Sequence, residues 1–444
     1  MSLLPTRRLA LFAAVVAVAM AAFPADRAGF GDVPVWQGVA AVTALLVVIG
    51  LLDGFLGTHP RQLVLERRHP PVLEVGREGT VTWVVRSESG RRLRMRVADE
   101  LAPSLHAGTR RFRVDVPAGD VVRTTIRIRP SRRGLFELDN LVVRIDGRLG
   151  LGSRQRSVPL RTVLRVHPAF PSREEAEIRI RRARVLEVGL RSARGIGGGT
   201  EFEQLREYGP DDEFRRIDWT ATARAGKPIV RTYRAERNQS VLVMLDNGRI
   251  MAGKVAGVPR VEHAMDAAQM LTTVATRLGD RCGLVAFDRR VRSVVPPGRH
   301  HDQVGRVGEA LYRLEPELAE SDYPGAFAEV LARYRRRVML VLLSDLNLQA
   351  VSDSVLPALP LVTRTHLVVI AAVQDPQVVA WASERAVDAE SAYRQAAAVQ
   401  ALADRERTSV RLRALGVTVV DATPGRLGTE VTDAYLVAKS TGRL

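Results

Sequence analysis

The sequence is poor in several residue types that mark particular classes of site. Its 444 residues include a single cysteine, Cys282, which excludes an intramolecular disulfide framework and a cysteine-rich zinc or iron–sulfur centre. Aromatic residues make up only 5% of the chain and are not interleaved with its basic stretches. A surface for nucleic acid would combine the two residue types. We therefore expect neither redox chemistry nor nucleic-acid binding.

Motifs of known enzyme classes are also missing from the sequence. It contains no Gly-x-Ser-x-Gly nucleophile elbow, and Cys282 begins an apolar stretch, where a thiol is normally inert. The stretch 248–255 approaches a phosphate-binding loop, but Val255 stands where a serine or threonine would bind magnesium. The adjacent histidines His300 and His301 lack the spacing of paired metal ligands. The sequence predicts a protein that is not an enzyme.

The charge of the chain is strongly one-sided. The formal net charge is +17, and lysine occurs only at Lys227, Lys254 and Lys439, so nearly all basic residues are arginines. These arginines are spread along the whole chain instead of forming one patch. Such a distribution favours attraction to an anionic membrane surface, and we expect membrane lipids to be partners.

Two apolar runs near the N-terminus predict a transmembrane helical hairpin over residues 1–58. The helices are expected at 9–23 and 33–52, and the second run carries no charge and is long enough to cross a bilayer. Basic residues flank the outer ends of the runs, whereas the loop Pro24–Asp32 holds one arginine against two aspartates. The positive-inside rule then gives a multi-pass protein of the inner, cytoplasmic membrane with its soluble domains in the cytoplasm. Alternatively, the short first run is a cleavable signal peptide.

Residues 60–170 alternate between apolar and polar side chains with the period of β-strands. The clearest examples are Thr80–Val85, Arg111–Val116 and Val122–Ile128, and turn signals such as Pro70-Pro71 and Asp146-Gly147 separate such stretches. Short strands at this spacing predict a β-sandwich of the immunoglobulin or arrestin type.

Residues 171–239 are interpreted as a linker followed by a distinctive charged region. The stretch Ser172–Val185 is rich in arginine and glutamate and is expected to be helical. A glycine cluster at Gly195–Gly199 precedes a charged stretch with regularly placed aromatic residues. We expect a surface helix and turn over 199–219, and then a strand at Ile229–Tyr233 that pairs with the sheet of the next domain.

Residues 240–444 predict an α/β domain. The amphipathic helix Val261–Leu278 follows a buried apolar strand at Val241–Leu245, and further apolar strands alternate with helical stretches. Unbroken apolar strands separated by helices indicate a parallel sheet that is covered on both faces. These further strands are expected at Gly283–Phe287, Val338–Leu343, Leu367–Ala372 and Val417–Val420.

Two carboxylates stand at the ends of predicted parallel strands. Asp246 and Asp345 each follow an apolar strand directly, so both are expected at the carboxyl edge of the sheet, where such folds bind ligands. With Ser321 they form a candidate Mg²⁺ site, because hard cations prefer oxygen ligands. The site is degenerate, since Gly248 and Ile250 replace the two serines that von Willebrand A-like domains place there. Alternatively, the two aspartates cap neighbouring helices.

The region around residue 210 resembles the signature of domain-of-unknown-function family 58. This family consists of von Willebrand A-like, Rossmann-type proteins that are associated with MoxR-type AAA+ ATPases. The resemblance is also supported by Leu245-Asp246, by the strand that ends at Asp288 and by Ser344-Asp345-Leu346. The signature residues are Glu201-Phe202, Leu205-Arg206-x-Tyr208, Pro210-x-Asp212, Arg215-Arg216-Ile217-Asp218-Trp219 and Ala223-Arg224.

The resemblance implies a membrane-anchored, non-catalytic adaptor that works with such an ATPase in the assembly or maturation of other protein complexes. Seven signature residues are expected to bind the partner or to brace its docking face, with an internal packing role as the alternative for Asp218 and Trp219. Two other functions stay open, namely a metal-dependent adhesion-type module and an undetected envelope hydrolase. The seven residues are Glu201, Arg206, Tyr208, Asp212, Arg215, Asp218 and Trp219.

Overall fold

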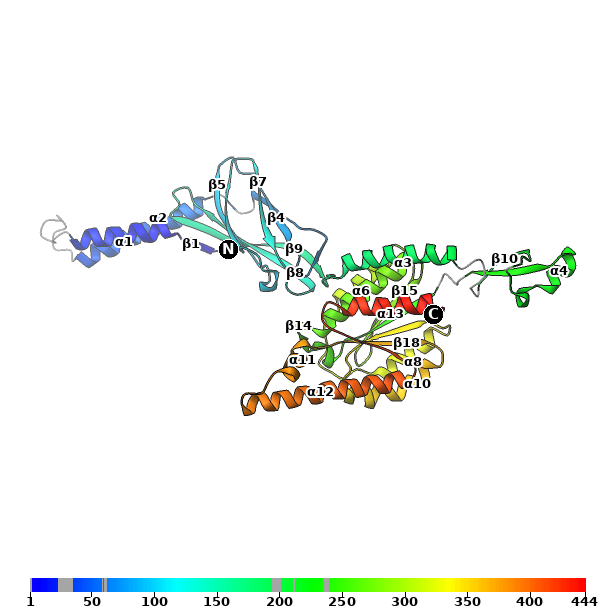
Figure 1. Cartoon of the computed structure of the whole chain (residues 1–444). Coiled ribbons are helices and arrows are strands. Elements are labelled where there is room, and N and C mark those ends of the chain that lie inside the picture. The colour runs from blue at the N-terminus through cyan, green and yellow to red at the C-terminus, as the bar shows by residue number, and fades with distance from the viewer. Residues whose placement is uncertain are drawn as a thin grey trace. The chain divides into compact units, whose positions relative to one another are not determined.

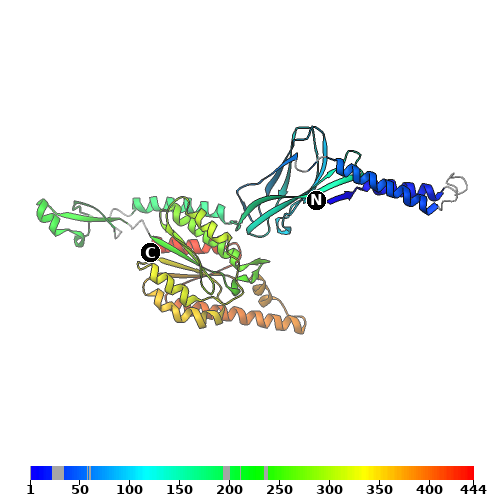
Figure 2. The ribbon, with the colours of Figure 1, turned by 180° about the vertical axis from the view of Figure 1, so that it is seen from behind.

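The computed structural model describes most of the chain and divides it into two compact units, 1–167 and 168–444 (Figures 1 and 2). The described residues are 2–22, 35–57, 59, 62–193, 201–210, 212–234 and 239–444. The predicted hairpin loop Pro24–Asp32 and the glycine cluster 195–199 lie outside these residues.

The first unit contains a β-sandwich, in agreement with the alternating sequence pattern. One sheet has the strand order β1-β9-β8-β5-β6, with β3 pairing to β9, and the other has the order β2-β4-β7. Apolar side chains from both sheets share one core that includes Trp83, Met95 and Leu141. The strands are β1 (Ser2–Pro5), β2 (Leu63–Arg68), β3 (Val72–Glu74), β4 (Gly79–Ser87), β5 (Leu93–Asp99), β6 (Arg111–Val116), β7 (Val121–Ile128), β8 (Gly134–Asp146) and β9 (Gly152–His167).

The N-terminal helices belong to the same unit as the sandwich. Helix α1 (Arg7–Ala22) has 16 residues, and α2 (Val35–Leu56) ends at Leu56 instead of at the predicted Leu52. Within the described residues, one helical stretch, Gln37–Leu56 of α2, is long and apolar enough to cross a membrane. The predicted segments 1–58 and 60–170 are not separate units, because β1 precedes α1 and pairs with β9.

The second unit is built on a six-stranded sheet with the order β16-β15-β12-β17-β18-β19. All strands are parallel except β16 at one edge, and the first strand, β12, lies between β15 and β17. The chain therefore extends the sheet in both directions from β12, and the switch in strand order falls there. The strands are β12 (Ser240–Asp246), β15 (Arg281–Phe287), β16 (Val291–Gly298), β17 (Met339–Leu343), β18 (Leu367–Val373) and β19 (Thr418–Ala422).

Helices cover both faces of this sheet and bury two separate apolar cores. Alternate residues of β12 belong to different cores, Val243 to one and Met244 to the other, as expected for a strand that is buried on both sides. Helices α3 (Arg173–Ala193), α6 (Arg260–Arg277), α7 (Gln303–Tyr312) and α13 (Leu427–Ser440) pack on one face. Helices α8 (Tyr323–Arg333), α10 (Leu356–Thr363) and α12 (Ala389–Ala414) pack on the other. Shorter helices are α5 (Arg249–Ala252), α9 (Leu348–Ala350) and α11 (Pro376–Ser383).

The signature region forms a β-hairpin, which corrects two predictions. The expected surface helix is strand β10 (Glu201–Glu207), and the expected strand β11 (Ile229–Arg234) pairs antiparallel with β10 instead of joining the parallel sheet. The apolar residues Phe202 and Leu205 are three positions apart, a spacing that does not separate a short strand from a helical turn, so the pairing with β11 decides the conformation. Between the strands lie a 3₁₀ turn (Phe214–Arg216) and helix α4 (Trp219–Ala225).

Candidate functional site

The hairpin is held in shape by a bidentate ion pair near the end of β10. Arg206 donates to both carboxylate oxygens of Asp212, at 2.7 and 2.5 Å, and the Gly209 N–H donates to the same carboxylate at 2.8 Å. The hydrogen bond from Gly209 and that from Arg206 lower the pKa of Asp212 below its ordinary value. The carboxylate therefore stays ionised at neutral pH and fixes the loop that follows β10.

A second carboxylate joins α4 to β11. Asp218 caps the N-terminus of α4 by accepting hydrogen bonds from the N–H groups of Thr220 and Ala221, at 3.0 and 3.1 Å. Arg231 on β11 donates to its other oxygen at 2.7 Å, and this bond is the main reason that the pKa of Asp218 is lowered. Asp218 is therefore an internal support of the hairpin, as the alternative interpretation proposed.

The hairpin presents apolar side chains to solvent despite this bracing. Phe214 and Trp219 are 68% and 61% exposed and lie edge to face, with ring centroids 5.6 Å apart. Leu205 and Tyr208 are also exposed. The alternative of an internal packing role does not hold for Trp219, because most of its indole surface is accessible. Large aromatic side chains on a rigid support are typical of protein-binding surfaces.

The other two signature residues have different positions. Arg215 lies beside Phe214 with an exposed side chain, and no hydrogen bond or ion pair joins it to another described residue. Glu201 begins β10, and its side chain lies outside the described part of the chain. The structure thus leaves Arg215 exposed next to Phe214 in the chain and uses Arg206, Asp212 and Asp218 as braces.

At the carboxyl edge of the sheet, Asp246 is buried and fully hydrogen bonded. One carboxylate oxygen accepts from the Gly248 N–H at 2.9 Å and from Ser321 Oγ at 2.5 Å. The other oxygen accepts from Tyr323 Oη and Ser344 Oγ, both at 2.7 Å. Burial and the nearby Asp246 raise the pKa of Tyr323, so its hydroxyl stays protonated as a donor.

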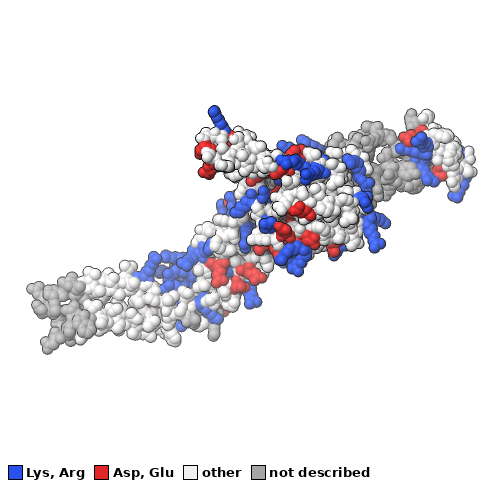
Figure 3. All heavy atoms as spheres, turned by 90° about the horizontal axis from the view of Figure 1, so that it is seen from below, with Lys and Arg blue, Asp and Glu red and all other residues white. Residues whose placement is uncertain are grey.

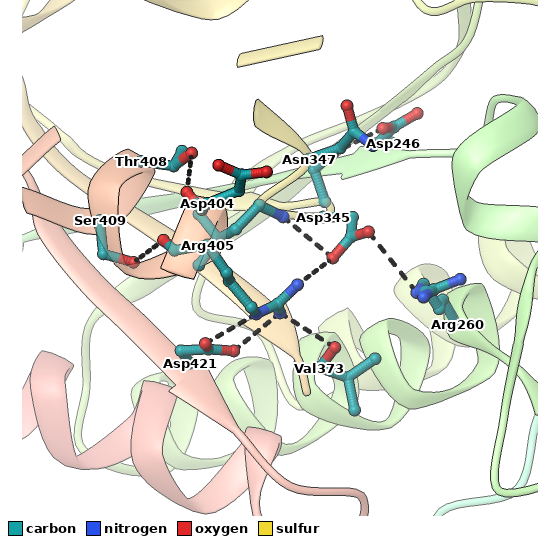
Figure 4. A network of polar contacts seen from close by, with 12 residues as sticks. Asp246, Arg260, Asp345, Asn347, Val373, Asp404, Arg405, Thr408, Ser409 and Asp421 are labelled. Atoms are coloured by element: carbon teal, nitrogen blue, oxygen red, sulfur yellow. Dashed lines mark hydrogen bonds and ion pairs between the residues drawn. The ribbon is translucent and has the colours of Figure 1, made fainter. Parts of the chain in front are cut away.

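Asp345 faces arginines instead of the Asp246 carboxylate (Figure 4). Arg405 on α12 donates to Asp345 at 2.7 Å, and Arg260 forms a longer ion pair with Asp345 at 3.7 Å. Arg405 also makes two bonds of 2.7 Å to Asp421 and one of 3.0 Å to the Val373 carbonyl oxygen. Burial alone would lower the pKa of Arg405, but its bonds to Asp421 and Asp345 outweigh burial and raise it. Arg405 therefore stays charged and joins the ends of β17, β18 and β19.

A cavity of about 520 Å³ lies beside this network at the carboxyl ends of the strands. Its lining combines apolar side chains with charged ones of both signs, among them Arg260, Arg405, Asp345, Asp375 and Asp404. Asp375 caps helix α11 through the Gln377 N–H at 2.9 Å, so part of its hydrogen-bonding capacity is already used.

The residues present do not fit the Mg²⁺ site that the sequence suggested. The structure brings Ser321 onto Asp246, but four donors already saturate the Asp246 carboxylate. Asp345 points to two guanidinium groups, whose positive charge would repel a cation. The helix-capping alternative also fails for Asp246, since Gly248 occupies the N-cap of α5.

Sequence reasoning missed the residues that complete this edge. Tyr323 stands two residues after Ser321, but nothing local shows that its hydroxyl reaches Asp246. Arg405 lies within a long, polar helix among many other arginines, and its partners are distant in sequence. The one signal available was topological. Both residues lie in connections between predicted strands of a parallel sheet, and such connections pass the carboxyl edge of the sheet.

The comparisons with known proteins support the resemblance seen in the sequence. A family model described as "Protein of unknown function DUF58" matches residues 204–392. Uncharacterised proteins of Mycobacterium bovis and Mycobacterium tuberculosis are 29% identical over 151 residues, which is 34% of this chain and 48% of each relative. The chain thus spans about half the length of the curated relatives that it matches.

Solved structures resemble parts of the chain only distantly. The CARDB domain of a Pyrococcus furiosus protein, crystallised with di-metal ions, covers 23% of this chain and 91% of that domain, with 14% identity and a TM-score of 0.16. A Caenorhabditis elegans member of the MSP family covers 24% of this chain and 97% of its own, with 16% identity and a TM-score of 0.17.

Proposed function

We propose, from the DUF58 match over residues 204–392, that the protein is a membrane-anchored, non-catalytic adaptor that docks a MoxR-type AAA+ ATPase through the hairpin β10–β11. The observation that carries this proposal is the exposed Phe214–Trp219 pair on a hairpin braced by two ion-paired carboxylates. Such a rigid aromatic surface loses little conformational entropy on binding.

The chemistry beside the aromatic pair suggests what the partner surface offers. Arg215 adds an exposed positive charge next to Phe214, whereas the charges of Arg206 and Arg231 are used within the hairpin. A partner surface with an apolar pocket and a neighbouring carboxylate would complement this arrangement. Aromatic anchors flanked by arginine are typical of interface hot spots.

The α/β unit is proposed to be of the von Willebrand A type, acting without a metal. Its strand order and the switch in that order at β12 suit the class. The Asp345 carboxylate is paired with arginines and the Asp246 carboxylate is fully hydrogen bonded, so neither is free to bind a cation. This disfavours the metal-dependent adhesion module.

The position of the first strand supports a proposal for the membrane arrangement. Strand β1 precedes α1 in the chain and β2 follows α2, and both strands belong to the same unit as the two helices. We propose that both helices enter the bilayer as a hairpin and that the soluble units face the cytoplasm, where the ATPase is found.

The test is co-purification of the full-length protein from native membranes, with bound proteins identified by mass spectrometry. The double substitution Phe214→Ala and Trp219→Ala should remove the ATPase. Tyr393→Ala on α12 is the matched control, since this aromatic side chain is 80% exposed and lies outside the hairpin. Recovery of the ATPase with the double variant would overturn the docking site.

Parallel purifications with a chelator separate the competing functions. An adaptor of the proposed kind retains its partner in chelator, whereas an adhesion module that needs a cation would lose it. If wild-type protein captures no ATPase in either condition, the adaptor proposal fails. The purified protein should then be assayed with ester, phosphate and glycoside substrates.

A further inference from the structure

The turn between β8 and β9 is fixed by a carboxylate of the apolar helix α2. Asp53 accepts a hydrogen bond from the Leu149 N–H at 2.8 Å on one oxygen. Its other oxygen accepts from the N–H groups of Leu151 and Gly152, at 2.9 and 3.1 Å. Asp53 is buried, although it lies on a helix whose other faces are apolar. A charged residue near the end of such a helix therefore has a defined partner, the backbone of this turn.

The backbone of α2 also packs directly against β9. A Cβ atom at Gly152 would lie 1.8 Å from the Gly50 carbonyl oxygen, so only glycine fits there. On the other side of the turn, Thr6 Oγ donates to the Gly150 carbonyl oxygen at 2.6 Å, and the Thr6 N–H donates to the Leu151 carbonyl oxygen at 3.0 Å. The turn is thus held between the start of α1 and the end of α2.

The side chains that this turn presents to its surroundings are apolar and basic. Leu149 is 62% exposed, and its neighbour Arg148 is exposed as well. Arg7 and Arg8, at the start of α1, are also exposed, and a Cβ atom at Gly150 would lie 3.2 Å from Arg8 Nη1. Figure 3 shows Lys and Arg gathered beside the white helical segment of this unit.

The depth of the turn follows from the end of α2. The stretch that is long and apolar enough to cross a membrane ends at Leu56, only three residues after Asp53. In the membrane arrangement proposed above, this places the turn at the level where the hydrocarbon meets the headgroups. At this level a leucine side chain can enter the apolar layer, while arginines reach the phosphates.

We propose that the β8–β9 turn, residues 147–151, is a membrane-contact element. Leu149 inserts into the bilayer interface, and Arg148, Arg7 and Arg8 bind the phosphates of anionic phospholipids. The inference rests on the membrane anchoring in the proposed function, but it does not depend on the ATPase.

The insertion of Leu149 can be measured with a site-specific label. The native Cys282 is buried, so Leu149→Cys can be labelled with an environment-sensitive fluorophore in the full-length protein. Leu135→Cys is the matched control, because this exposed leucine lies near the start of β8, at the other end of that strand from the turn. In phosphatidylcholine vesicles with nitroxide-labelled lipid, the label at position 149 should be quenched several-fold more than the label at 135. Equal quenching at both positions would overturn the insertion.

The contribution of the arginines is tested by the lipid headgroup. Adding about 30% phosphatidylglycerol should raise quenching at position 149, and Arg148→Gln should reduce this response, since each basic residue near an anionic leaflet contributes roughly fivefold in affinity. Inorganic phosphate at the same concentration should leave the signal unchanged. If phosphatidylglycerol does not raise the quenching at position 149, or if free phosphate raises it equally, the headgroup site is overturned. Loss of the ATPase in co-purification with normal quenching would instead count against the proposed function alone.

Discussion

Arg405 and Asp345 form an ion pair in which Arg405 Nη1 donates to Asp345 Oδ1 at 2.7 Å, and the same guanidinium also binds Asp421. The pair places a fixed positive charge beside a carboxylate that the sequence suggested for a cation. The carboxylates of Asp345 and Asp421 at this edge are therefore paired with a side chain of the protein itself.

Removing Arg405 should strongly destabilise the α/β unit. Arg405→Gln leaves Asp345 and Asp421 without their main partner, and breaking a buried pair in this way typically costs about 3–5 kcal/mol. Thermal and chemical unfolding of the purified protein will measure the change. Arg407→Gln is the matched control on the same helix, because Arg407 is 58% exposed and its substitution should alter the free energy of unfolding by less than about 0.5 kcal/mol. Equal effects of the two substitutions would contradict the role of Arg405.

Mg²⁺ should have no effect on the stability of the protein. Because donors saturate Asp246 and arginines face Asp345, neither Mg²⁺ at millimolar concentration nor a chelator should shift the melting temperature by more than about 1 °C. A rise in melting temperature with Mg²⁺ that Asp246→Ala abolishes would instead support the metal site.

The hydroxyl of Tyr323 should contribute to stability by satisfying Asp246. Tyr323→Phe keeps the ring, which packs on Phe287, but removes the donor to a buried carboxylate. We expect a loss of about 1–3 kcal/mol. Tyr393→Phe, at an exposed position, is the control and should be neutral. The free energy of unfolding from denaturant titrations will distinguish the two variants, and similar values for both would argue against the hydrogen bond.

The stability of the α/β unit should depend on the protonation of Asp266. Burial raises the pKa of Asp266 to about 6, although Ser172 donates two hydrogen bonds to it. The folded state thus binds this proton more tightly than the unfolded state. Its contribution is fully present below pH 3.8 and is lost as the pH rises through about 6.

Asp266→Asn should therefore stabilise the protein more at pH 7.5 than at pH 5, by about 1–1.5 kcal/mol. Unfolding curves at both pH values, with the exposed Asp353→Asn as control, will measure this difference. If the free energies of unfolding of wild type and Asp266→Asn differ by the same amount at pH 5 and pH 7.5, Asp266 is ionised in the folded protein over this whole range.

The first apolar run should remain in the mature protein. Strand β1 pairs with β9 from Ser2 opposite Gln155 to Pro5 opposite Gly152, so cleavage after α1 would remove an edge strand from the sandwich. The intact mass of protein purified from membranes should therefore include residues 2–22. A mass that begins after Ala22 would identify the run as a signal peptide.

The regular parts of the fold could be predicted from the sequence because each element carries its own pattern. The apolar run at Val241–Leu245 and the helical periodicity from Val261 to Leu278 lie close to β12 and α6. Strand β1 could not be predicted, since Ser2–Pro5 is short and its partner lies far along the chain. Its pairing depends on the tertiary structure.

The candidate site was predicted less well than the fold. The sequence placed Asp246 and Asp345 at one edge correctly, because both end parallel strands. It did not reveal which way Asp345 faces, since that depends on Arg405, 60 residues away. The hairpin was misread because seven residues with mixed polarity fit a short strand and a helical turn equally.

The pairing of Ser2 with Gln155 has a consequence for the order of assembly. Residues 2–5 are synthesised well before their partner strand, so they cannot join the sheet until β9 has been made. Helices α1 and α2 are complete long before that point, so they can enter the bilayer while the sandwich is still unfinished. Closing so long a loop is slow compared with local folding. Strand β1 is therefore among the last strands to join its sheet, and its pairing with β9 connects the start of α1 to the completed sandwich.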